Sequence, residues 1–193
     1  MSKLEKPMFT VSEYLEMDRR SSDKQEFAFG EIFAMTGASA RHVEIVGNIA
    51  RELGNQFRHR PCRVYAADLR LCVDAEHRYT YPDVVAVCSQ PQFLDDTLDT
   101  LLNPELIVEV LSASTRNYDR GDKFEQYRGI PSFREYLLVA QERVHVERHL
   151  KQPDGTWSLW ETNYISDAVR LESVGVTLSV SEIYFKIDFN QSH

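Results

Sequence analysis

Two short apolar runs, each with one acid, constrain this chain more than any other feature. Residues 84–87 are Val-Val-Ala-Val and directly follow Asp83, and residues 106–111 are Leu-Ile-Val-Glu-Val-Leu, with Glu109 inside the run. Apolar runs of this length without polar alternation are typical of strands that are buried on both faces of a sheet. A buried carboxylate needs a partner charge, a proton or a metal ion, because an unpaired buried charge is very costly.

Periodicity and turn residues predict the elements around these two strands. Helices are predicted over residues 10–18, 40–58 and 119–129, with a last short helix capped by Ser179 and Glu182. Further strands are predicted over residues 25–29 and 31–36 (a hairpin about Gly30), 63–66, 69–74, 133–139, and 144–150 with 156–162 (a second hairpin). This order predicts an α/β sandwich in which helices flank one central mixed sheet. We expect a single domain over residues 1–193, with an N-terminal helix and hairpin and a C-terminal hairpin extension.

Length and composition exclude several classes of protein. A chain of 193 residues can bury one core without metal or disulfide staples. No apolar run approaches the ~18 residues of a membrane span, and residues 1–10 lack the apolar segment of a secretory signal. We therefore expect a cytoplasmic protein. Its cysteines, Cys62, Cys72 and Cys88, are odd in number and lack CxxC spacing, which predicts reduced thiols rather than a disulfide scaffold or a zinc finger.

Charge is unevenly distributed along the chain. The net charge is −8, from 22 basic and 30 acidic side chains. Residues 79–114 hold no basic and six acidic side chains, whereas the flanking residues 41–78 and 115–152 are mildly basic. A general polyanion binder would be basic throughout. The pattern fits a phosphate track beside an acidic metal site, or an ordinary mixed surface, and the counts alone favour the mixed surface.

Asp83 and Glu109 are the first candidates for chemistry. Two acids on neighbouring strands could point at one cation, and Mg²⁺ binds through one or two carboxylates, waters and substrate phosphates. Taken alone, Asp83 could be a strand-entry residue, and Glu109 could be paired with an arginine. Together, and followed by a helix that carries Lys123, they favour a functional site.

Six ordered stretches carry a resemblance to a known family. They are residues 26–31 (EFAFGE), 39–42 (SARH), 81–84 (YPDV), 106–115 (LIVEVLSAST), 118–127 (YDRGDKFEQY) and 134–139 (REYLLV). Pro82-Asp83 followed by Glu109-Val110-Leu111 resembles the PD-(D/E)XK nuclease pattern. The chain as a whole is similar to the Uma-type family of restriction-endonuclease-like proteins, over residues 10–186.

The resemblance implies a metal-dependent endonuclease that acts on DNA. Asp83 and Glu109 would hold Mg²⁺ or Mn²⁺ in a restriction-endonuclease-like fold. Leu111 stands where the pattern expects a lysine, so the resemblance implies that Lys123 takes its role from the following helix, orienting water and offsetting phosphoryl charge. Tyr127 lies on the same helical face. Without the resemblance, Lys123 would be a solvated lysine paired with Asp119.

Four further residues are candidates with an ordinary alternative each. The resemblance places Glu31 at the edge of the site as an additional acid, but it could be only a hairpin-edge residue. His42, in the first turn of a helix, could face a phosphate or cap and pack the helix. Asp68 could be a third metal ligand or a turn neighbour of Arg70. Arg120 could contact phosphate or only solubilise the surface.

Other functions and an assembly remain open at this point. The scaffold could be a catalytically silent binding or assembly module, which the acidic balance and the missing in-strand lysine favour, or it could hydrolyse a smaller phosphoester. Cutting both strands of a duplex favours a homodimer. The C-terminal aromatics are the candidate interface, although at least half of them should close the monomer's own core: Trp157, Trp160, Tyr164, Tyr184 and Phe185.

Overall fold

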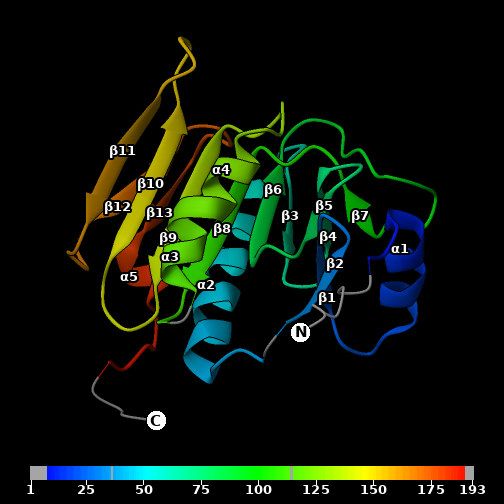
Figure 1. The fold of residues 1–193 in the computed structure, drawn as a ribbon. Helices are drawn as coiled ribbons and strands as arrows, with labels where there is room; N and C mark the ends of the chain where they lie inside the picture. Colours follow the sequence, from blue (N-terminus) through cyan, green and yellow to red (C-terminus); the bar gives the residue numbers. More distant parts are fainter. Residues whose placement is uncertain (1–7, 36, 114, 190–193) are drawn as a thin grey trace.

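A mixed six-stranded sheet forms the centre of the computed structural model, which describes residues 8–35, 37–113 and 115–189 (Figure 1). Its order is β11-β10-β9-β8-β6-β3. The strands are β3 (Arg63–Ala66), β6 (Val84–Val87), β8 (Leu106–Leu111), β9 (Glu135–Ala140), β10 (Val146–Lys151) and β11 (Trp157–Thr162). Only β8 and β9 are parallel neighbours in this sheet. The predicted mixed sheet, the two buried strands and the C-terminal hairpin are therefore confirmed.

A second, five-stranded sheet lies beside the first and has the order β2-β1-β5-β4-β7. Its strands are β1 (Gln25–Ala28), β2 (Glu31–Ala34), β4 (Arg70–Asp74), β5 (Arg78–Thr80) and β7 (Thr100–Leu101). The predicted hairpin is present, and its predicted end at Thr36 lies outside the described residues. The central mixed sheet is present as predicted, but the expectation that it is the single sheet is wrong. β5 and β7 have three and two residues, too few to show alternation in the sequence.

Helix α1 (Val11–Arg20) covers this second sheet and begins with the predicted capping box, in which Thr10 and Glu13 bond each other's backbone. Tyr14 of α1 stacks on Phe27 at a centroid distance of 5.0 Å, and Tyr79 completes the cluster. Figure 1 shows α1 and the β10–β11 hairpin at opposite ends of the molecule.

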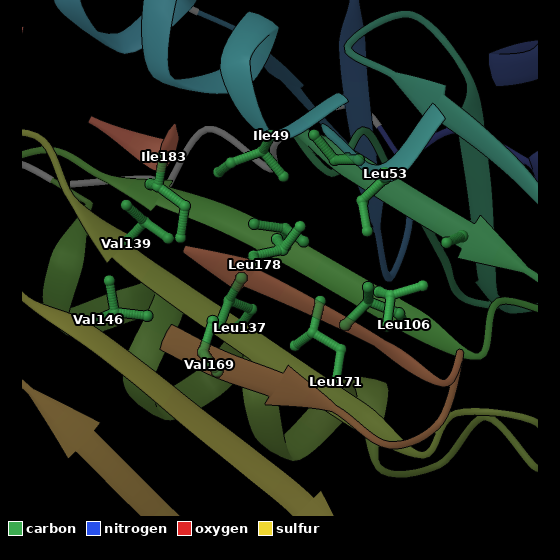
Figure 2. Close-up of a cluster of buried hydrophobic side chains, with 14 of the residues drawn as sticks. Ile49, Leu53, Leu106, Leu137, Val139, Val146, Val169, Leu171, Leu178 and Ile183 are labelled. Carbon is green, nitrogen blue, oxygen red and sulfur yellow. The ribbon is translucent and has the colours of Figure 1, made fainter. Parts of the chain in front are cut away.

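Helix α2 (Ala40–Phe57) covers one face of the large sheet, as its apolar stripe predicts. Ile49 and Leu53 meet sheet residues such as Leu106, and the layer is completed by β12 (Ala168–Leu171), β13 (Val176–Ser179) and α5 (Val180–Ile183) (Figure 2). The last helix is present where predicted, but the Ser179 hydroxyl bonds the Ser181 hydroxyl instead of capping it.

The opposite face of the large sheet carries a short helical segment. It consists of α3 (Arg116–Tyr118), a π-helical turn (Asp119–Lys123) and α4 (Phe124–Tyr127). Successive side chains of β8 point to opposite faces of the sheet. Val108 and Val110 pack toward α2, whereas Ile107 and Leu111 pack with Tyr127. Glu109 therefore projects on the side of the helical segment.

The cysteines correct one prediction. Cys62 and Cys88 flank the β3–β6 ladder, where Arg63 lies opposite Val87, and the two cysteines form a disulfide. Cys72 is free and buried. The expectation of three reduced thiols is wrong because sequence spacing does not reveal a register that brings together two residues 26 positions apart. Within the described residues, no helix is long and apolar enough to cross a membrane.

Candidate active site

The register of β6 and β8 brings Asp83 and Glu109 together. Val84 lies opposite Val108 in this antiparallel pair, so Asp83, one residue before β6, lies opposite Glu109. Directly opposite residues share a sheet face. The Asp83 carboxylate also accepts the Val110 backbone N–H at 2.7 Å, which ties it to β8. The two acids thus meet on one face, as the sequence predicts.

Lys123 reaches the same place from the helical segment. Its ammonium lies 3.0 Å from the Glu109 carboxylate, and the Tyr127 hydroxyl donates to the same Glu109 oxygen at 2.8 Å. The Lys123 nitrogen also lies 3.4 Å from Asp119 and 3.9 Å from Glu26. Glu109 and Lys123 are both buried. One lysine, one tyrosine and four acids, Asp83, Glu109, Asp119 and Glu26, therefore form a single cluster.

Lys123 is the last residue of a π-helical turn. The sequence predicts an ordinary helix over residues 119–129, whereas residues Asp119–Lys123 form a wider turn and α4 ends at Tyr127. π-turns are rare and occur frequently at functional sites. Here Asp119 and Lys123 are both buried, as the first and last residues of the turn.

Burial and charge set the electrostatics of the cluster. Burial raises the pKa of Glu109 to about 8, the Lys123 ammonium opposes that shift, and the Asp83 and Asp119 carboxylates add to it. Burial also raises the pKa of Asp119. Burial alone would lower the pKa of Lys123, but Glu109, Glu26 and Asp119 raise it well above its ordinary value. Acids outnumber the one lysine, so the cluster has an excess of negative charge.

His42 lies at the edge of this cluster. Its Nε2 is 2.9 Å from Asp83 Oδ1, and its backbone N–H donates to Ser39, the N-cap of α2, at 3.2 Å. The structure therefore directs His42 to the Asp83 carboxylate.

Two other predicted residues, Asp68 and Arg120, lie elsewhere. Asp68 is 81% exposed and forms an ion pair with Lys24. Within the described ranges, no three His, Cys, Asp or Glu side chains are grouped to hold a metal ion, so the predicted ligand set of Asp83, Glu109 and Asp68 is not formed. Arg120 is held in an ion pair by Glu147, with its Nε 3.0 Å from Oε1. Sequence neighbours suggest such roles but do not show where a side chain points.

Glu31 lines a cavity beside the cluster, together with Glu26. Sequence reasoning gave no role to Glu26 and treated Asp119 only as an alternative partner of Lys123. The available signals were weak: Asp119 precedes Lys123 by four residues, and Glu26 belongs to one of the six stretches. Glu26 reaches the cluster from the second sheet, where Thr80 donates a hydrogen bond to it.

Comparison with known proteins agrees with this architecture. The model of the family Uma2, described as "Putative restriction endonuclease", matches residues 11–181. Two Synechocystis proteins, "Uncharacterized protein sll1609" and "Uncharacterized protein slr1290", are 38% and 35% identical over 154 and 184 residues. The alignments cover 80% and 95% of this chain, and 87% and 95% of the relatives.

A solved structure shares the fold. It is a "putative nuclease belonging to DUF820" from Anabaena variabilis, with a TM-score of 0.74 at 15% identity. The match covers 91% of this chain and 97% of that one. The predicted family and the predicted nuclease-like α/β fold are therefore confirmed.

Proposed function

Because this chain belongs to the Uma2 family of restriction-endonuclease-like proteins, we propose that it is a metal-dependent endonuclease that hydrolyses DNA phosphodiester bonds. One observation carries the proposal: Asp83 and Glu109 lie opposite each other on β6 and β8, with the Lys123 ammonium 3.0 Å from Glu109. A buried cluster of titratable groups with perturbed pKa values is typical of a functional site.

Mg²⁺ or Mn²⁺ is the cofactor that this cluster fits. Two carboxyl groups are a suitable donor set, since Mg²⁺ is usually held by one or two protein carboxylates, and binding would release the proton that Glu109 holds below about pH 8. Asp83 and Glu109 would hold the ion. When bound, it would polarise a phosphate oxygen and make a neighbouring water more acidic.

The other residues position these carboxylates and offset charge. Tyr127 fixes Glu109 by its hydrogen bond, and His42 does the same for Asp83. Such outer contacts orient metal-binding carboxylates. The Lys123 ammonium offsets negative charge that develops on the phosphoryl oxygens and orients the attacking water. Removing it should slow cleavage without removing the two carboxylates.

A cleavage assay with matched variants tests the proposal. Wild type should nick or cut DNA in Mg²⁺ or Mn²⁺ and stop in EDTA. Asp83→Ala and Glu109→Ala should each lower the rate at least about a thousandfold, because the ion contributes several kcal/mol to the transition state. Asp68→Ala is the control, since that exposed carboxylate pairs with Lys24. Activity that resists EDTA, or full activity in both variants, would contradict the proposal.

A silent binding or assembly module is the second candidate. Lys123 already pairs with Glu109, and Leu111 occupies the position where a nuclease of this pattern carries its lysine. If wild type binds nucleic acid but cleaves no DNA or RNA in either metal, the module is the better description.

We also propose a homodimer, with the exposed side of the C-terminal hairpin as the contact. The ring centres of Trp157 and Phe124 lie 5.1 Å apart within the monomer's own core, so Trp157 is a poor probe of an interface. Leu159 and Tyr164 are 56% and 71% exposed. Leu159→Lys with Tyr164→Lys should dissociate the dimer in sedimentation equilibrium. A wild-type species of single-chain mass at micromolar concentration would refute it.

A further inference from the structure

A cavity of about 500 Å³ lies beside the candidate active site, between the β1–β2 hairpin and the helical segment that carries Lys123. This volume is within the range of about 300–1,000 Å³ that is usual for small-ligand sites. Two residues of the cavity wall join it to the cluster through Lys123: Glu26, which belongs to the cluster, and Tyr118. Glu26 lies 3.9 Å from the Lys123 nitrogen, which in turn lies 5.8 Å from the centre of the Tyr118 ring. A molecule in the cavity would therefore lie next to the cluster.

Three aromatic side chains in the cavity wall are exposed to solvent. Phe29, Phe33 and Tyr118 are 60%, 48% and 38% exposed. They come from the hairpin turn, from β2 and from α3, so three separate elements present rings to one space. Gathered exposed apolar surface is typical of a binding site.

Phe29 is held in a conformation that bulky residues rarely adopt. Its φ is +49°, in the left-handed region, and the turn continues through Gly30 at +84°. The Phe29 backbone N–H donates to the His77 carbonyl at 2.8 Å, and the Arg78 guanidinium lies 5.0 Å from the Phe29 ring centre. Such conformations persist where the surroundings fix them, and they cluster at functional sites. The ring is therefore presented in a fixed position.

The charges of the cavity identify the kind of occupant. Three carboxylates line it, those of Glu26, Glu31 and Asp122, against the one guanidinium of Arg78. An excess of acids disfavours a phosphate inside the cavity. Carboxylates accept hydrogen bonds from the N–H groups on base edges, and aromatic rings stack on base faces. The wall thus suits a flat, N–H-bearing ring without its phosphates.

We propose that this cavity receives one unpaired nucleobase of a nucleic acid strand whose neighbouring phosphodiester lies at Asp83, Glu109 and Lys123. This inference rests on the proposed function and names its substrate class: a strand with an unpaired or extruded base, rather than a perfect duplex. Opening a duplex costs free energy, which an already unpaired base avoids. Stacking tolerates any base, because every base has an aromatic face.

The test uses a single strand of about 12 nucleotides, a length in the range of single-strand binding sites, with 2-aminopurine at its centre. Fluorescence and anisotropy are measured in Ca²⁺ and, separately, in EDTA, for this strand and for the same strand in a duplex. The variant is Phe29→Asn with Phe33→Leu, since asparagine tolerates positive φ and both rings are exposed. The control is Phe185→Leu, another exposed phenylalanine with a guanidinium, that of Arg51, 5.3 Å from its ring centre.

We expect wild type and Phe185→Leu to quench 2-aminopurine and to bind the single strand more tightly than the duplex. The double variant should bind about tenfold or more weakly, without quenching, while its thermal unfolding stays as in wild type. Equal binding by the double variant, tighter binding of the duplex by wild type, or no single-strand binding would each overturn the inference. Binding and quenching without any cleavage would leave the cavity assignment standing and refute only the endonuclease.

Discussion

Two of the places where the protein buries charged groups differ in how the charges are balanced. Asp18 of α1 and Arg70 of β4 form a buried ion pair, in which Tyr81 also donates to Asp18 and Thr100 accepts from Arg70 at 2.8 Å. The buried acid therefore meets one buried base, which the partly exposed Asp99 also approaches to 3.3 Å, and hydrogen bonds surround both groups. Around Lys123, by contrast, Glu109, Asp119 and Glu26 all lie within 4 Å of one ammonium.

The difference separates a structural ion pair from a candidate active site. A balanced buried pair offsets its own desolvation only with good geometry, and it joins the elements that carry it. Asp18 and Arg70 join α1 to the second sheet. An excess of buried acids leaves unfavourable charge in the folded state, which a bound cation would relieve. Loss of an acid, a change of pH and addition of a metal ion should therefore change the free energy of unfolding differently at the two clusters.

The largest expected change in the free energy of unfolding comes from breaking the balanced pair of Asp18 and Arg70. Asp18→Asn takes the nearest carboxylate from the buried Arg70 guanidinium and leaves it only the partly exposed Asp99, 3.3 Å away, so we expect a loss of about 3 kcal/mol in the free energy of unfolding, measured in urea. Asp18→Leu with Arg70→Met is the matched control. It removes both charges and should recover most of the loss. A loss below about 1 kcal/mol for Asp18→Asn would show that the pair is not structural.

The unbalanced cluster should respond in the opposite sense to loss of an acid. Burial raises the pKa of Glu109 to about 8, so the folded state binds more protons than the unfolded state from about pH 4 upward. The stability that this proton contributes is full at acid pH and is lost as the pH rises to about 8. Glu109→Gln should remove this decline, which has a slope of at most about 1.4 kcal/mol per pH unit, and should not destabilise the protein at pH 8.

Asp99, which lies near Arg70, should change stability with pH in the direction opposite to Glu109. The Arg19 guanidinium holds the pKa of Asp99 below its ordinary value, so its contribution to stability is present at neutral pH and is lost on acidification below about pH 4. Urea unfolding of wild type and Glu109→Gln between pH 3 and 9 separates the two effects. Both proteins should lose stability below about pH 4, whereas the loss of stability as the pH rises to about 8 should occur in wild type alone. The same decline in the free energy of unfolding of both proteins as the pH rises to about 8 would contradict the role given to Glu109.

Metal should stabilise only through the unbalanced cluster. Mg²⁺ at about ten times its dissociation constant would add about 1.4 kcal/mol to the free energy of unfolding. We expect this gain in wild type and in Asp18→Asn, because that variant keeps the site, and we expect it to disappear in Glu109→Gln. Thermal unfolding with and without Mg²⁺ measures it. An equal gain in Glu109→Gln would place the ion elsewhere.

The contrast also shows which features the sequence could predict. Asp83 and Glu109 stand out because a carboxylate in or next to an apolar strand is anomalous, whereas their common face depends on the register of β6 and β8, which the sequence does not show. Asp18 and Arg70 are 52 residues apart, and their pairing depends on how a second sheet packs, which no local pattern encodes. The same limit applies to Glu26, which reaches Lys123 from that sheet, and to the disulfide of Cys62 and Cys88. The π-turn has no signal of its own beyond Gly121 at its centre.

The smallest expected effect concerns an exposed pair of the same chemical types. Asp68 pairs with Lys24 at an exposed turn, and the sequence alone leaves Asp68 open as a third metal ligand. An exposed ion pair contributes about 0–1 kcal/mol, so Asp68→Ala should change the free energy of unfolding by less than about 1 kcal/mol. The Mg²⁺-induced gain should be unchanged, because no described group of three acids includes Asp68. A loss of that gain in Asp68→Ala, measured by thermal unfolding beside Glu109→Gln, would return Asp68 to the metal site.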